Sequence, residues 1–432
     1  MTWPTANATA RSGRSAASVS TRAREQFAGG PFWLFLLVVA SCLETVTVAV
    51  GPATLRPVQF VAGLLILVHA SRRIGPTSTM VRSASSTIAL IALLAIVPFL
   101  AHPDALRILQ PGLLATNVLL MAVAFVTYRA SDPKKANLAI GIGLFAVTLV
   151  PFVQFVLVAA GALPIFADGR LYGLGRESGT FEEANWSGIV AGFAFFWGAT
   201  FGSGGLAAES LLVAILSASR TVWASLIVAG ARLVLPGLSR TALAGVGFSV
   251  LVLATVAFTP VTSAFLTPTY DVTTLDSRLL DQSFALSRLT PEEWIVGSGQ
   301  LDLYDYSRSR QLPVTMNNAY TDFVWKQGVF GLGTLAVVMV SFLASWPRAA
   351  KIRVPPWRAN PVVLFISSIV LFSFANSALL RPWLYVLAGL AYAASVPGDR
   401  EVRAVQIADL PPLLPPEPQG RRARRLPVEN GP

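Results

Sequence analysis

The sequence predicts an all-α integral membrane protein with about twelve transmembrane helices and a large outward loop that carries short helices. The composition leads to this prediction. Hydrophobic residues make up 54% of the 432 residues, charged residues make up only 13%, and the mean hydropathy is +0.61. Soluble proteins carry roughly 25% charged residues, so most apolar side chains are expected to face lipid.

A helix that crosses a bilayer needs about 20 mostly apolar residues. The apolar runs that approach this length lie at residues 32–50, 55–70, 86–101, 107–128, 138–161, 185–202, 206–218, 220–235, 241–259, 318–345, 361–379 and 382–396. They define a membrane domain at 32–396. A basic cytoplasmic tail precedes it at 1–31, and a tail rich in Pro and Arg, predicted to be disordered, follows at 397–432.

The basic residues predict the orientation of these spans. If the N-terminus is cytoplasmic and the chain alternates through twelve spans, about two thirds of the 33 Lys and Arg residues fall on the cytoplasmic side. This distribution follows the positive-inside rule and puts both termini in the cytoplasm. The net charge of +11 therefore reflects basic loops, and nucleic acid is not an expected partner.

The cysteine and histidine content limits the chemistry of the chain. A single cysteine, Cys42, excludes an intramolecular disulfide and a cysteine-based metal site. The two histidines, His69 and His102, are too few and too far apart in the sequence to suggest a zinc site. We therefore expect no bound metal.

Two connections on the predicted outer side are longer than the others, at residues 162–184 and 260–317. Long loops of this kind are usually functional or disordered, and the second contains many aromatic and aliphatic residues. Within it, the stretch 275–290 has apolar residues at roughly helical spacing. A short helix on the outer membrane surface is predicted there.

Six arginines on the predicted outer side lie at span ends or in the two long loops: Arg170, Arg176, Arg220, Arg278, Arg288 and Arg381. A guanidinium binds a phosphate through two parallel charged hydrogen bonds. Each arginine taken alone is equally compatible with a side chain that snorkels to the interface. As a group on a side depleted of basic residues, they indicate an anionic ligand.

Three motifs follow one another on this side. The first is Arg176-Glu177-Ser178-Gly179-Thr180-Phe181 with Asn185, and the second is Ser219-Arg220-Thr221 at the start of an apolar run. The third runs from Ser277-Arg278 through Gly297-Ser298-Gly299 to Asn317-Asn318, nine further residues and Gly328-Val329-Phe330-Gly331. In this order they resemble the O-antigen ligase and O-antigen polymerase superfamily of bacterial envelope proteins, over about residues 30–396. Ligases of that family have a histidine where Asn317 stands.

The resemblance implies an enzyme of the bacterial cytoplasmic membrane that assembles envelope polysaccharide. A saccharide on undecaprenyl diphosphate would be transferred to an acceptor hydroxyl, without a nucleotide sugar, metal or other cofactor. The implied partners are the lipid-linked saccharide, its acceptor, the bilayer and envelope-assembly proteins. The loss of the histidine favours a polymerase over a ligase. A flippase or transporter of lipid-linked saccharides and a scaffold without catalytic activity are the alternatives from other classes.

The site residues are carried over from the three motifs. Arg220 is expected to bind the diphosphate with Arg176, and Arg278 would assist. Further substrate contacts are expected from Gly179, Asn185, Arg288 and Asn318.

An asparagine at position 317 orients a hydroxyl but is not a base at neutral pH, so a carboxylate is the expected base. The candidate carboxylates in or beside the long loops are Glu177, Glu182, Glu183, Asp276, Asp281 and Asp322. Asp322 is equally compatible with a favourable charge at a helix N-terminus. Glu44 and Glu209 are placed inside predicted spans, where a carboxylate usually has a function.

Overall fold

The structure is a computed structural model. It describes residues 29–50, 53–71, 78–103, 105–160, 184–217, 219–234, 282–298, 319–349, 360–372 and 378–395. The chain divides into two units, Met1–Ser395 and Val396–Pro432, and every described residue lies in the first. The predicted span 241–259 lies outside the described residues.

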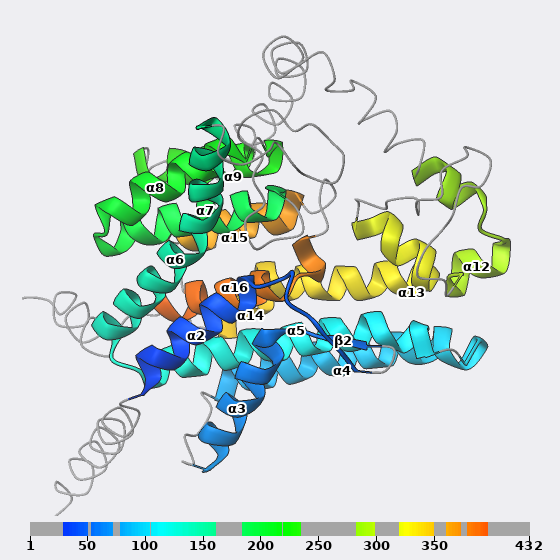
Figure 1. The fold of residues 1–432 in the computed structure, drawn as a ribbon. Coiled ribbons are helices and arrows are strands. Elements are labelled where there is room, and N and C mark those ends of the chain that lie inside the picture. Colours follow the sequence, from blue (N-terminus) through cyan, green and yellow to red (C-terminus); the bar gives the residue numbers. More distant parts are fainter. Residues whose placement is uncertain are drawn as a thin grey trace, which may run out of the picture. The chain divides into compact units, whose positions relative to one another are not determined.

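The described part of the chain is helical, as predicted (Figure 1). Most of its long helices follow the predicted apolar runs within a few residues, but the helix Ser78–Ala101 begins eight residues before the predicted run 86–101. The α-helices are α2 (Gly30–Cys42), α3 (Pro57–Ser71), α4 (Ser78–Ala101), α5 (Ala105–Ala130), α6 (Pro133–Ala159), α7 (Ala184–Phe201), α8 (Gly204–Leu216), α9 (Arg220–Val234), α12 (Pro291–Val296), α13 (Ala319–Val340), α14 (Trp346–Ala349), α15 (Pro361–Leu371) and α16 (Pro382–Ala394). A π-helical turn, η2 (Ser341–Ser345), joins α13 to α14, and a 3₁₀ turn, η5 (Ala378–Leu380), precedes α16.

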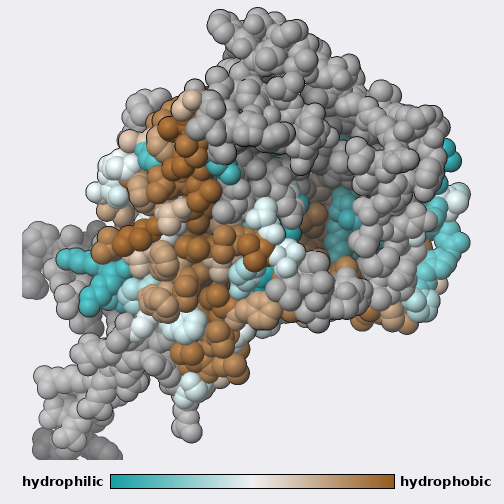
Figure 2. Space-filling model, viewed as in Figure 1, coloured by the Kyte–Doolittle hydropathy of each residue, from teal (hydrophilic) through white to brown (hydrophobic). Residues whose placement is uncertain are grey.

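Four helical stretches are long and apolar enough to cross a membrane: Thr79–Ala101, Ile108–Ala130, Pro133–Leu157 and Ala319–Arg348. Six shorter apolar helices of 10–17 residues accompany them among the described residues. Many large apolar side chains are exposed, and Figure 2 shows hydrophobic residues gathered over the described surface of one face. This pattern is that of a membrane protein, while the predicted count of about twelve spans is not confirmed.

The prediction of a first span over residues 32–50 is wrong at its end. Helix α2 stops at Cys42, and a short antiparallel hairpin follows, with β1 (Val48–Val50) paired to β2 (Ala53–Leu55). Residues 46–50 are apolar, which suggested a longer helix, but Thr45, Val46, Thr47 and Val48 are β-branched and favour a strand. Glu44 consequently lies in the turn after the helix and not inside it.

Helix α13 is broken near its middle. Gly328 has a φ of 60° inside it, a conformation that only glycine adopts readily, and Figure 1 shows α13 in two arms. A Cβ on Gly328 would overlap the carbonyl of Ile295, and one on Gly297 would overlap the carbonyl of Lys326. The two glycines therefore let the end of α12 cross the backbone of α13 at the break.

Helix α16 lies at the centre of the described packing, because residues 382–393 are all buried. It contacts α5, α2 and α15. The hydroxyl of Tyr392 donates to the carbonyl of Phe342 at 2.7 Å, and that of Tyr385 donates to the carbonyl of Leu379 at 3.0 Å. Both buried hydroxyls are thus satisfied, and Arg381, the residue directly before this helix, adjoins a tightly packed element.

Candidate functional site

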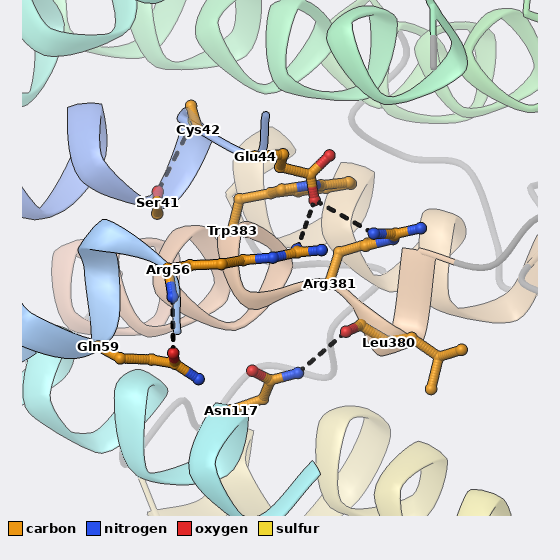
Figure 3. A network of polar contacts seen from close by, with 9 residues as sticks. All are labelled: Ser41, Cys42, Glu44, Arg56, Gln59, Asn117, Leu380, Arg381 and Trp383. Carbon is orange, nitrogen blue, oxygen red and sulfur yellow. Dashed lines mark hydrogen bonds and ion pairs between the residues drawn. The ribbon is translucent and has the colours of Figure 1, made fainter. Parts of the chain in front are cut away.

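A buried carboxylate, Glu44, is the centre of a polar cluster formed by three distant parts of the chain (Figure 3). Its side chain has no exposed surface. Arg56 Nη1 donates to Glu44 Oε1 at 3.2 Å and Trp383 Nε1 donates to the same oxygen at 3.0 Å. Arg381 Nη1 lies 3.9 Å from it. We call these four residues, with Trp186, the Glu44 cluster.

The local structure explains how these side chains meet. The hairpin reverses the chain after Glu44, so Arg56 returns directly beside it and stands just before α3. The backbone N–H of Arg56 donates to the side chain of Gln59 at 2.8 Å, which fixes the start of that helix. Arg381 follows η5 and precedes Pro382, the first residue of α16. Three helix ends therefore converge on one carboxylate.

Arg381 is stacked on an aromatic ring from a fourth element. Its guanidinium carbon lies 3.5 Å from the ring centre of Trp186, which is 1% exposed and lies near the start of α7. Arginine stacks on an indole through its planar face and keeps its N–H groups pointing sideways. The indole N–H of Trp186 is buried and makes no hydrogen bond to the described residues.

The start of α7 also touches the start of α9. A Cβ on Gly188 would overlap the side chain of Ser217 and would lie 3.3 Å from Val222 Cγ2. Arg220 is the first residue of α9, and only its backbone is described. Asn185, which is partly buried, precedes Trp186. The start of α7, which carries Asn185 of the first motif, therefore contacts the start of α9, and Trp186 in the same turn of α7 contacts Arg381.

A second cluster surrounds Asp322 in the first turn of α13. Gln110 Nε2 in α5 donates to Asp322 Oδ2 at 2.8 Å, and Lys326 Nζ pairs with Oδ1 at 2.6 Å. Asp322 is 8% exposed. Asp322 therefore has a hydrogen-bond partner on another helix. A carboxylate that only stabilised the N-terminus of its own helix would not need such a partner. We call these three residues the Asp322 cluster.

Helix α5 connects the two clusters. Asn117 Nδ2 donates to the carbonyl of Leu380 at 3.2 Å, directly before Arg381. Gln110 and Asn117 are seven residues apart, so they lie on the same face of α5 and about 10 Å apart along its axis. Asp322, predicted to be catalytic, and Arg381, one of the predicted outward arginines, are therefore placed along one helix face.

The described part of the large loop lies against α13. Residues 282–287 are helical, which agrees with the predicted helix at 275–290; residues 275–281 lie outside the described part. The buried side chains are Ala285 and Leu289, which pack on Val324 and Trp325. Arg288 is exposed and lies 4.9 Å from the ring centre of Phe284. Its side chain makes no hydrogen bond or ion pair with another predicted site residue among those described.

Five predicted site residues lie outside the described part of the chain: Arg176, Gly179, Arg278, Asn317 and Asn318. Sequence reasoning missed Arg56, Trp383 and Gln110. Glu44 gave a usable signal, because a carboxylate in an apolar run requires a buried partner. Nothing in the sequence indicated which residues these partners would be.

Within the described residues, no three His, Cys, Asp or Glu side chains come together to hold a metal ion. A search of protein-family models finds no match to the chain, and a search of curated proteins finds none either. The arrangement offers guanidinium and indole donors beside a buried carboxylate, and a second carboxylate held by an amide and an ammonium. Such groups can bind an anion and orient a hydroxyl.

Proposed function

We propose that the chain is a membrane glycosyltransferase that polymerises envelope polysaccharide. It transfers a saccharide from undecaprenyl diphosphate to an acceptor hydroxyl at the outer face of a bacterial cytoplasmic membrane. One observation carries this proposal. The starts of α7, α9, α13 and α16, each of which follows a predicted outward connection, lie around the Glu44 and Asp322 clusters. The motif resemblance supplies the substrate class.

The reaction is a displacement at the anomeric carbon. The acceptor oxygen forms a bond to that carbon, the bond from the carbon to the phosphate oxygen breaks, and undecaprenyl diphosphate leaves with the bonding electrons. The acceptor proton passes to a base. Because negative charge grows on the departing diphosphate, fixed cationic donors stabilise the transition state most. In this proposal Arg176, Arg220 and Arg278 supply those donors.

Asp322 is the proposed base. Gln110 and Lys326 fix the orientation of its carboxylate. A diphosphate is a good leaving group, so a carboxylate suffices as the base. Asn317 and Asn318 would orient the acceptor, and Gly179, Asn185 and Arg288 would contact the saccharide.

We also propose about twelve spans, with both termini cytoplasmic. The contacts between helix ends support the predicted alternation, since they join ends that it assigns to the same side. On the predicted cytoplasmic side, His69 Nε2 lies 3.0 Å from Thr127 Oγ1. On the outer side, His102 Nε2 lies 3.1 Å from Glu292 Oε1.

Turnover in a defined membrane tests the function. The purified protein in nanodiscs is incubated with an undecaprenyl-diphosphate oligosaccharide, and chain length and released lipid diphosphate are measured. We expect longer chains from the wild type and a loss of product with Arg220→Ala or Arg176→Ala. Arg348→Ala is the matched control, because this exposed arginine lies on the predicted cytoplasmic side. The absence of product with every donor tried would contradict the function, and activity in both outer variants would contradict the site.

The same assay separates polymerase from ligase activity. A polymerase extends the saccharide when the lipid-linked donor is the only sugar present. A ligase forms product only after a second acceptor, such as a lipid A core or a glycan acceptor on protein, is added. We expect the first outcome.

A transporter of lipid-linked saccharides is the second candidate, and the break in α13 favours it. Transporters use interrupted helices near their substrate sites, and α13 combines the break at Gly328 with the π-helical turn η2. The clusters nevertheless lie at helix ends, as an enzyme of the outer face requires. Movement of an intact labelled donor between leaflets, without release of lipid diphosphate, would identify a transporter.

A further inference from the structure

We propose that Arg381 binds the diphosphate of the lipid-linked donor and that Trp186 and Glu44 position it. This inference rests on the proposed function and assigns a residue that the three motifs do not contain. Its basis is the geometry around the start of α16.

The guanidinium of Arg381 is fixed on its flat side. It lies 3.5 Å from the ring centre of Trp186, so its face is covered and its N–H edge is directed sideways. The side-by-side N–H groups of a guanidinium edge suit the several oxygens of a diphosphate.

Glu44 holds Arg381 more loosely than it holds its other partners. Its Oε1 is 3.0 Å from Trp383 Nε1 and 3.2 Å from Arg56 Nη1, but 3.9 Å from Arg381 Nη1. A distance of 3.9 Å exceeds a normal hydrogen bond. Glu44 can therefore orient Arg381 by charge while Arg56 and Trp383 keep the carboxylate in place when Arg381 contacts a ligand.

The exposure of the side chains also supports ligand binding by Arg381. The side chain of Arg381 is 17% exposed, whereas that of Glu44 is 0% exposed. The guanidinium can be reached by a ligand, and the carboxylate behind it cannot. An anion would therefore meet the cation first and would not be repelled at close range by an exposed carboxylate.

The location fits the proposed reaction. Arg381 lies beside the start of α7, which follows the segment containing Arg176. The start of α7 in turn contacts Val222 near the start of α9. Along α5, the Asp322 cluster is about 10 Å further on. A diphosphate and the sugar ring attached to it can bridge that separation. Arg381 would hold the leaving group while Asp322 faces the acceptor.

Binding of undecaprenyl diphosphate tests this inference without requiring turnover. Affinity is measured by native mass spectrometry in nanodiscs, with undecaprenol as the uncharged probe. Arg381→Lys keeps the charge but removes the planar fork, and we expect it to weaken diphosphate binding by roughly tenfold or more and to leave undecaprenol binding unchanged. Arg348→Lys, the matched control, should bind both lipids as the wild type does.

Trp186 tests the positioning role. Trp186→Phe keeps an aromatic face under Arg381 and should retain most of the diphosphate affinity, whereas Trp186→Ala should lose about as much as Arg381→Lys. A role in folding alone would lower the affinity for both lipids together and would not be rescued by phenylalanine.

Equal diphosphate affinity in Arg381→Lys and the wild type would overturn the inference. Turnover that persists in Arg381→Lys with an unchanged KM for the donor would overturn it too, and would leave the proposed function intact. Conversely, diphosphate binding that depends on Arg381, without turnover of any donor, would support the binding site and contradict the transferase.

Discussion

The Glu44 cluster and the Asp322 cluster lie along the same helix, α5, but they are built differently. The Glu44 cluster joins two guanidiniums and two indoles from separate parts of the chain, and Trp383 is 339 residues from Glu44. The Asp322 cluster contains a local pair, with Lys326 four residues after Asp322, and one residue from another helix. The first therefore depends on the whole fold, and the second depends mainly on one helix start.

This difference suggests a structural role for Glu44 and a role in the reaction for Asp322. A carboxylate buried at 0% exposure must keep its cations to remain charged, so Glu44 serves the structure and positions Arg381. Asp322 has one partner on each oxygen and a side-chain exposure of 11%. It can exchange a partner for a substrate hydroxyl at lower cost. The comparison therefore predicts a stability effect at Glu44 and an activity effect at Asp322.

The largest stability effect is expected for Glu44→Ala. It removes the carboxylate between Arg56 and Arg381, and breaking a buried ion pair costs roughly 3–5 kcal/mol. The free energy of unfolding in mixed micelles measures this loss. The control is Glu292→Ala, whose carboxylate is 72% exposed. If both variants unfolded at the same denaturant concentration, the structural role of Glu44 would be refuted.

A somewhat smaller effect is expected for Gly328→Ala. The positive φ costs about 1–3 kcal/mol in an L-residue, and the new Cβ would overlap the carbonyl of Ile295. The crossing of α12 and α13 should loosen, which exposes amides near Trp325 to hydrogen exchange. Gly205→Ala is the control, since nothing lies within 4 Å of its Cβ. Wild-type exchange in Gly328→Ala would mean that the break is not needed.

Asp322→Asn is expected to change activity more than stability. The amide keeps a hydrogen-bonding group near Gln110 but removes the ion pair with Lys326 and the base. Turnover should fall by about 100-fold, while the free energy of unfolding falls by about 1 kcal/mol. Rates and unfolding are measured on the same preparations. A variant with wild-type turnover would show that Asp322 serves only the start of α13.

The smallest effect is expected for the exposed pair at His102 and Glu292, which lies outside both clusters. The side chains are 49% and 72% exposed, so solvent screening leaves the pair worth less than about 1 kcal/mol. Glu292→Gln should have nearly wild-type stability and turnover. A loss comparable to that of Glu44→Ala would mean that the loop's attachment to α4, and not the Glu44 cluster, controls the site.

Helix positions could be predicted from the sequence because a long apolar run in lipid must satisfy its own backbone hydrogen bonds, and a helix does so. The runs at 107–128 and 138–161 correspond to α5 and α6 within a few residues. Prediction was wrong after Cys42, where an apolar, β-branched stretch forms a hairpin. The run at 361–379 was also too long, since α15 ends at Leu371. Hydropathy alone does not distinguish these conformations.

The sequence pointed to single residues of the site but not to the contacts between them. Glu44, Arg381 and Asp322 were recognised as polar groups in or beside apolar runs. Their partners were not, because a contact such as Trp383 to Glu44 depends on tertiary packing that no local pattern encodes. The Gly328-Val329-Phe330-Gly331 motif was noticed for its spacing, but the helix break that requires Gly328 was not predicted.

The stoichiometry of the reaction tests the proposed function most directly. Lipid diphosphate released and glycosidic bonds formed are counted in one reaction, with the wild type, Arg381→Lys and Arg348→Lys. The account predicts one lipid diphosphate per bond in the wild type and the Arg348 variant, and a fall in both quantities together in the Arg381 variant. Bonds formed without release of lipid diphosphate, or donor moved between leaflets without either product, would contradict it.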